Sequence, residues 1–170
     1  MNDDDIIMKS FDDIFSHLIT LEGGYVNNPH DKGGETKYGI TVAVARANGY
    51  KGNMKNLSIQ TAKNIYYKQY WLKNKCDKLP LKVAFHFFDA CVNHGAQNAV
   101  RFLQRAVSVA DDGIIGKITL TAVNNQSEIN TVFRMNAERL SFYTKLSTFK
   151  TFGKGWINRI ASNLKFGADL

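Results

Sequence analysis

Apolar residues recur along most of the chain at the three- and four-residue spacing that places side chains on one face of an α-helix. The first such run consists of Phe11, Ile14, Phe15, Leu18 and Ile19. Ser10 precedes the run and Asp13 follows three residues later, a pattern typical of an N-terminal cap. We therefore expect an amphipathic helix that begins after Ser10 and ends at Gly23 and Gly24.

The next segment, 25–40, lacks this periodicity. Its clusters of Gly, Asn, Pro and Asp favour turns, so we expect an irregular loop or a small hairpin. Beyond it, Thr41 is expected to cap a short helix over 42–48 that stops at Gly49.

The rest of the chain reads as further helices. Ser58 is suited to cap a helix that runs to about Leu72, and Pro80 is suited to begin the next one. The later helices are expected over 81–92, 96–109, 119–123 and 127–146, and from Gly155 onward. A break at 93–95 and a turn at 111–113 separate some of them. Strand signals are weak, so the predicted fold class is mainly α.

Composition supports a folded chain of 170 residues, with 44% hydrophobic residues and two prolines. No apolar run reaches about 18 residues, and the sequence opens with MNDDD, which is acidic where a secretory signal is basic. We therefore expect synthesis in the cytoplasm, with no signal peptide and no membrane insertion. Cys76 and Cys91 lack the spacing of a metal or disulfide framework and are expected to be core thiols.

Positive charge is concentrated in one part of the chain. The net charge is +7, and the stretch 46–82 holds nine Lys and Arg residues against one acid, Asp77. Such a stretch is either the solvated face of helices or a surface that attracts a polyanion, whether nucleic acid, membrane or cell wall. No nucleic-acid-binding motif accompanies it.

The end of the first predicted helix offers candidate acid chemistry. Glu22 would lie at the helix C-terminus, where the negative end of the helix dipole disfavours an ionised carboxylate, as a general acid requires. Asp31 and Thr36 follow in the loop. Glu22 could protonate a leaving oxygen while Asp31 and Thr36 orient a water molecule on the opposite face, as in an inverting glycosidase. Spacing alone does not separate this arrangement from an ordinary helix cap and turn.

The full string EGGYVNNPHDKGGETKYGIT, residues 22–41, resembles the signature of glycoside hydrolase family 108, the lysozyme-like N-acetylmuramidases. The matched positions are Glu22, Gly23, Gly24, Tyr25, Pro29, Asp31, Gly33, Gly34, Thr36, Gly39 and Ile40. The resemblance implies that Glu22 is the catalytic acid and that the fold is a lysozyme-like helical bundle with a small active-site loop. Similarity to the Glu, Asp and Thr of phage-type lysozymes suggests roles for Asp31 and Thr36, although the gap between these two differs slightly here.

The string FDACVNHGAQNAVRFLQRAVSVADDGIIGKIT, from Phe88, is similar to the predicted peptidoglycan-binding region that often follows this signature. The matching positions include Phe88, Asp89, Asn93, Gly95, Ala99, Leu103, Gln104, Asp112, Gly113, Gly116 and Thr119, and later Arg139, Tyr143, Gly155, Trp156 and Arg159. Lys117 stands where that region often has proline. We expect a catalytic region over 1–80 and a peptidoglycan-binding region over 81–170, packed as one compact unit.

Several residues are candidates for substrate binding: Tyr25, Tyr38, Tyr70, Asn93 and His94. Asn93 and His94 either reach sugar or peptide groups or satisfy backbone groups freed at the helix break. Tyr70, with Trp71 beside it, either stacks on sugar rings or belongs to the core.

Other polar residues have plainer interpretations. His86 is expected to be structural, whereas His30 borders the predicted site. The stretch 111–113 is expected to be a turn and not a calcium loop. Gln104 and Arg105 are expected to make polar contacts between helices.

The predicted function is hydrolysis of the β-1,4 bond between N-acetylmuramic acid and N-acetylglucosamine, by a monomer that needs no metal or cofactor. The expected partner is bacterial peptidoglycan, reached in the periplasm or outside the cell after release through another system. The alternatives are a wall-binding or scaffolding protein without activity and, on charge alone, a nucleic-acid binder. Both phage endolysins and secretion-associated bacterial muramidases fit the sequence.

Overall fold

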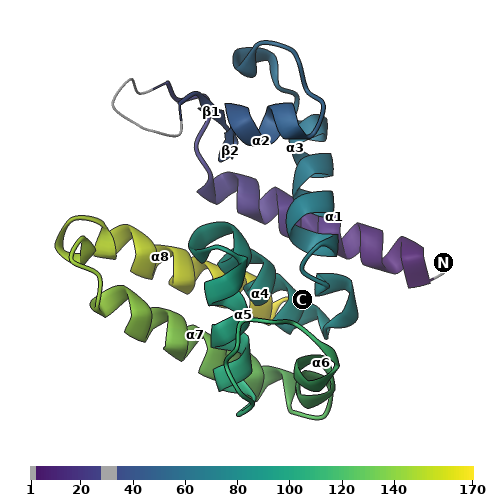
Figure 1. Cartoon of the computed structure of the whole chain (residues 1–170), viewed down its shortest axis with the longest axis vertical. Coiled ribbons are helices and arrows are strands. Elements are labelled where there is room, and N and C mark those ends of the chain that lie inside the picture. Colours follow the sequence, from purple (N-terminus) through teal and green to yellow (C-terminus); the bar gives the residue numbers. More distant parts are fainter. Residues whose placement is uncertain (1–2, 28–33) are drawn as a thin grey trace. The chain divides into compact units, whose positions relative to one another are not determined.

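The computed structural model describes residues 3–27 and 34–170, and its side chains from Ser10 onward. The chain forms two compact units, Met1–Gln69 and Tyr70–Leu170 (Figure 1). Helices dominate both units, and the described sheet has two short strands, β1 and β2. The expected mainly α, lysozyme-like class is therefore confirmed. The expected division near residue 80 stays a prediction.

The first helix, α1, spans Asp3–Leu21 and buries the apolar face that the periodicity indicated. Phe11, Ile14 and Leu18 are at most 1% exposed. The predicted start was wrong, because Ser10 lies inside the helix and does not cap it.

A small hairpin follows α1, as one of the two predicted possibilities. Strand β1 (Thr36–Lys37) pairs antiparallel with β2 (Ile40–Thr41). Tyr38 and Gly39 form the connection, and both have positive φ, 53° and 73°, as a two-residue type I′ turn requires. An isolated bridge between Val26 and Thr36 joins the chain just after α1 to this hairpin.

Short helices complete the first unit. Helix α2 (Val42–Ala47) is capped by the Thr41 side chain, and α3 (Ile59–Tyr66) by that of Ser58, as predicted. A 3₁₀ turn, Met54–Asn56, lies between them. The helical path continues beyond α3 as a π-helix over Tyr67–Leu72, so the predicted extent was right but the hydrogen bonding changes after Tyr66.

Helix α4 (Leu81–His94) lies at the centre of the second unit, and every residue from Val83 to Cys91 on it is buried. Helices α5 (Ala96–Ala106), α7 (Glu128–Thr144) and α8 (Phe149–Ala168) pack against it (Figure 1). A 3₁₀ turn, Cys76–Lys78, precedes α4, and α6 (Lys117–Asn124) precedes α7.

The boundaries in this unit lie within three residues of the predictions except at α8, and Asn93 and His94, expected in the break, are the last residues of α4. The chain breaks between α4 and α5 at Gly95, which has φ 78°, and Ser127 caps α7. Helix α8 begins at Phe149 and not at Gly155. Gly153 is buried inside the helix, where a Cβ atom would lie 2.7 Å from the Phe149 ring. That glycine serves close packing and does not interrupt the helix.

Both cysteines are buried free thiols, which confirms the prediction of core positions. Burial raises the pKa of the Cys76 and Cys91 thiols well above the ordinary range. Among the described residues, no helix combines the length and the apolar character that a membrane span requires.

Candidate active site

Glu22 is the first residue beyond α1, at the place the sequence predicted. Its backbone N–H still donates to the carbonyl of Leu18 (3.1 Å), and its side chain is half-buried. Gly23 and Gly24 follow it, exposed, with open space where a Cβ atom would stand. Neither glycine has positive φ. Their lack of side chains leaves the approach to Glu22 open.

Gly39 brings the hairpin turn against the Glu22 side chain. A Cβ atom on Gly39 would lie 2.7 Å from Glu22 Oε2 and 2.7 Å from the hydroxyl oxygen of Tyr66. Both distances are far shorter than a carbon–oxygen contact allows. The carboxyl, the phenol and the turn backbone therefore share one small space that only glycine leaves open.

Tyr66 belongs to α3 and is 1% exposed. Its hydroxyl donates to the carbonyl of Tyr38 (2.8 Å), and its ring lies against that of Phe15 on α1, with 5.8 Å between centroids. The sequence pattern did not single out Tyr66 from the other residues of its predicted helix. The available signal was Gly39, which matched the family signature but had no assigned role.

Tyr25 and Thr36 lie in the same unit as Glu22. The Tyr25 hydroxyl donates to Glu35 Oε1 (2.8 Å), and this hydrogen bond, with smaller contributions from burial and the Glu35 charge, raises the pKa of Tyr25. Lys55 Nζ lies 5.4 Å from the centre of the Tyr25 ring. The structure therefore brings Glu22, Tyr25, Thr36 and Tyr38 into one unit. Asp31 and His30 lie outside the described residues.

Asn93, His94 and Tyr70 belong to the second unit. Arg139 Nε donates to His94 Nε2 (3.2 Å), and the Tyr143 hydroxyl donates to Asn93 Oδ1. Burial, and then the charge of Arg139, lower the pKa of His94 to about 3. Internal partners thus occupy both side chains, but these partners are side chains and not the freed backbone groups of the structural alternative. The role of Asn93 and His94 in substrate binding stays a prediction.

These contacts extend into a buried ion network. Asp89, 1% exposed, accepts from Arg139 Nη2 (2.7 Å) and Arg159 Nη2 (2.8 Å). Burial alone would raise the pKa of Asp89, but the two guanidinium charges outweigh it and lower the pKa to about 2. Three helices, α4, α7 and α8, are therefore joined by one carboxylate. The network is structural in character, since its one carboxylate holds the guanidinium groups of two other helices.

The remaining polar candidates also have internal partners. The side chain of Gln104, 1% exposed, bonds Asp112 Oδ1 (2.7 Å) and the Gly113 N–H (2.9 Å), so the stretch 111–113 is a turn. Arg105 pairs with Asp111 at 2.6 Å. His86 is buried beside Asn136 Nδ2 (3.2 Å). Within the described ranges, no cluster of His, Cys, Asp and Glu could hold a metal ion.

Two aromatic residues at the start of the second unit have different environments. Trp71 is 2% exposed and packs edge-on against Phe88, with 5.5 Å between ring centroids. It belongs to the core. Tyr70 beside it is half-buried, and its stacking on a sugar stays a prediction.

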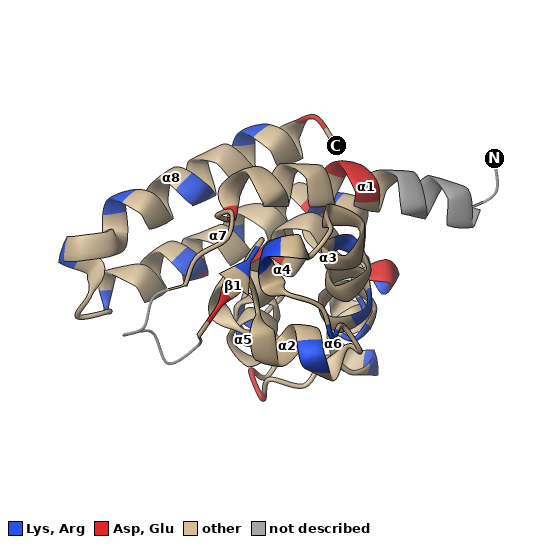
Figure 2. Ribbon diagram, turned by 90° about the horizontal axis from the view of Figure 1, so that it is seen from above, with Lys and Arg blue, Asp and Glu red and all other residues tan. Residues whose placement is uncertain are grey.

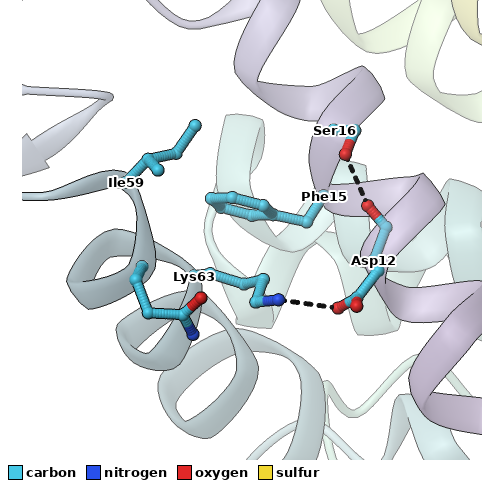
Figure 3. Close-up of a pocket in the computed structure, with 6 residues that line it drawn as sticks. Asp12, Phe15, Ser16, Ile59 and Lys63 are labelled. Carbon is cyan, nitrogen blue, oxygen red and sulfur yellow. Dashed lines mark hydrogen bonds and ion pairs between the residues drawn. The ribbon is translucent and has the colours of Figure 1, made fainter.

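A hollow of about 230 Å³ lies between α1 and α3, and Glu22 does not line it (Figure 3). The ion pair between Lys63 and Asp12 (3.0 Å) crosses it, and the Ser16 hydroxyl donates to the Asp12 carbonyl (2.7 Å). Its polar groups are paired with one another, so the hollow presents no acid chemistry.

Known protein families match most of the chain. Residues 15–95 match the family described as glycosyl hydrolase 108, and residues 98–161 match a family described as a predicted peptidoglycan domain. Twelve solved chains match significantly. One is the structure of Brucella abortus SagA, with 36% identity, a TM-score of 0.82 and 95% coverage of each chain. No curated protein matches significantly.

Two family matches in succession account for most of the chain, and the structural likeness extends over nearly all of it. The resemblance read from residues 22–41 and from Phe88 onward is thereby confirmed. The chain belongs to glycosyl hydrolase family 108, as a lysozyme-like peptidoglycan hydrolase with a peptidoglycan-binding region.

Proposed function

We propose that the protein cleaves the β-1,4 bond between N-acetylmuramic acid and N-acetylglucosamine, with Glu22 as general acid. The observation that carries this proposal is the position of the Glu22 carboxyl. It is half-buried at the end of α1 and bounded on one side by Gly39 and Tyr66. A carboxyl held in this way can donate its proton to one oxygen of a bound substrate.

The bond breaks between the sugar carbon and the bridging oxygen, and that oxygen takes the proton of Glu22. In the proposed single displacement, Asp31 and Thr36 orient a water molecule that attacks the same carbon from the opposite face. The water gives one proton to Asp31, and its oxygen becomes the new hydroxyl. Thr36 has a fixed backbone position for this task, because its N–H and carbonyl both bond to Val26 (2.8 and 2.9 Å).

Glu22→Gln tests the acid. This change keeps the shape of the side chain but removes its transferable proton, so release of reducing ends from purified sacculi should fall at least about 100-fold. Glu35→Gln is the matched control, since Glu35 is another half-buried glutamate of the same unit. It should keep activity within a few-fold. Activity of Glu22→Gln close to that of the parent would remove Glu22 from the mechanism.

Analysis of the products tests which bond is cleaved and with which stereochemistry. Mass spectrometry should find fragments that end in N-acetylmuramic acid, whereas fragments that end in N-acetylglucosamine would contradict the proposed bond. Proton NMR during cleavage should show the α-anomer first, because inversion at a β-linkage gives it. A β-anomer would indicate retention. Binding to sacculi without any released product would favour the wall-binding alternative.

A further inference from the structure

The Tyr38–Gly39 turn borders the Glu22 carboxyl, and a residue from another element holds that turn. Glu22 Oε2 and the Tyr66 hydroxyl oxygen both lie 2.7 Å from the point where a Gly39 Cβ atom would stand. The two oxygens are therefore at most twice that distance apart. Glu22 comes from the end of α1, Gly39 from the hairpin and Tyr66 from α3, so three elements converge on one group.

Tyr66 is the rigid member of this group. It is 1% exposed, and its ring packs on Phe15 with 5.8 Å between centroids. Phe15 lies two turns before Glu22 on α1, which places both residues on the same helix face. The Tyr66 ring is thus fixed against the helix that carries the proposed acid.

The Tyr38–Gly39 turn has an unfavourable backbone conformation that a neighbouring residue must stabilise. Tyr38 has φ 53°, a left-handed conformation that disfavours any residue with a Cβ atom. The hydrogen bond from the Tyr66 hydroxyl to the Tyr38 carbonyl (2.8 Å) holds the peptide group between Tyr38 and Gly39. Without it, the turn could relax away from Glu22.

We propose that Tyr66 is a positioning residue for the hydrolysis, which acts through the Tyr38–Gly39 turn on the orientation of the Glu22 carboxyl. The role rests on the proposed function of Glu22 as the acid. Small displacements of a catalytic group lower the rate of the chemical step strongly, whereas a group that does not touch the substrate leaves its binding unchanged. Tyr66 therefore influences turnover and not affinity.

Tyr66→Phe tests the role on soluble peptidoglycan fragments. We expect kcat to fall about tenfold or more and KM to stay within about twofold. Tyr50→Phe is the matched control, because the Tyr50 hydroxyl also donates to a backbone carbonyl of the first unit, that of Asn53, at the same 2.8 Å. The control should keep both constants within about twofold. Thermal unfolding checks that both variants are folded.

A second readout is independent of turnover. The Cδ resonance of Glu22, in protein labelled with ¹³C at glutamate carboxyls, can be assigned by its loss in Glu22→Gln. Tyr66→Phe should shift this resonance and Tyr50→Phe should not. If the resonance stays in place, or if it shifts while kcat is unchanged, the positioning role is wrong. An inactive parent protein would contradict the proposed function instead, and the resonance would then decide alone whether Tyr66 orients Glu22.

Discussion

At the scale of single residues, Gly39 matters more than the paired glycines next to Glu22. Gly23 and Gly24 have room for a side chain, whereas a Cβ on Gly39 would meet two oxygens at 2.7 Å. Tyr66 is buried and bonded to Tyr38, so the Glu22 side chain is the partner that can move. A methyl group at position 39 would therefore displace the proposed acid.

Gly39→Ala tests this displacement against Gly49→Ala. Both glycines have positive φ, 73° and 83°, but a Cβ on Gly49 would meet nothing within 4 Å. Each variant should lose about 1–2 kcal/mol of unfolding free energy through backbone strain. Only Gly39→Ala should also lose activity, by about tenfold or more. Equal activity of the two variants, measured on sacculi, would show that contact with Glu22 is not critical.

At the scale of elements, the second unit joins its helices through polar groups in its core. Asp89 on α4 pairs with Arg139 on α7 and Arg159 on α8, and His94 accepts from Arg139. A buried pair of this kind contributes little net stability, but the loss of one partner costs about 3–5 kcal/mol. The network therefore determines which helices pack together. Its stability depends on the protonation states of Asp89 and His94.

Stability should fall in acid because of His94. Its pKa is about 3 in the folded protein and 6.5 in the ordinary state, so between these values the unfolded chain binds a proton that the folded chain excludes. The contribution of neutral His94 to the unfolding free energy is therefore complete above pH 6.5 and decreases as the pH falls towards 3. His94→Gln should flatten this part of the profile in denaturant titrations. An unchanged slope in the variant would assign the pH dependence to other groups.

Asp89 acts in a lower pH window, which overlaps that of His94 only between about pH 3 and 3.8. Its pKa is about 2 in the folded state and 3.8 ordinarily, so its contribution is present above pH 3.8 and is lost as the pH falls through about 2. The two residues can therefore be distinguished in one titration.

At the scale of the whole molecule, the basic stretch 46–82 crosses the boundary between the two units. Lys51, Lys68 and Lys73 of this stretch are exposed, whereas Lys63 and Lys82 bond to Asp12 and to the carbonyls of Gly167 and Ala168. Basic positions also recur along α8 (Figure 2). The exposed part can attract the anionic cell wall.

Lysis of sacculi should therefore slow as salt is added. The screening length falls from about 30 Å at 0.01 M ionic strength to about 3 Å at 1 M. Replacing Lys51, Lys68 and Lys73 together with Gln should reduce both the rate at low salt and its dependence on salt. Cleavage of a short soluble peptidoglycan fragment, which carries few charges, should respond much less to both changes and serves as the control. A salt dependence that is equal in parent and triple variant would assign the attraction to other charges.

Local signals along the chain were enough to define much of the fold. The caps at Thr41 and Ser58 depend on side chains that bond to backbone within three residues, so their sequence pattern predicts them directly. The string at 22–41 likewise indicated the family and the proposed acid. The start of α8 was misread, because the glycine pattern at its predicted start did not reveal the packing of Gly153 on Phe149. The start of α1 at Asp3 was also missed.

Contacts between residues that are distant in the chain were decided by tertiary packing. The convergence of Glu22, Gly39 and Tyr66, and the burial of Asp89 between Arg139 and Arg159, each require at least two elements to meet at a fixed angle and depth. A periodic pattern states which face of a helix is apolar, but it does not state what that face will contact. Those contacts follow from the close packing of whole side chains, which forms only when the elements come together.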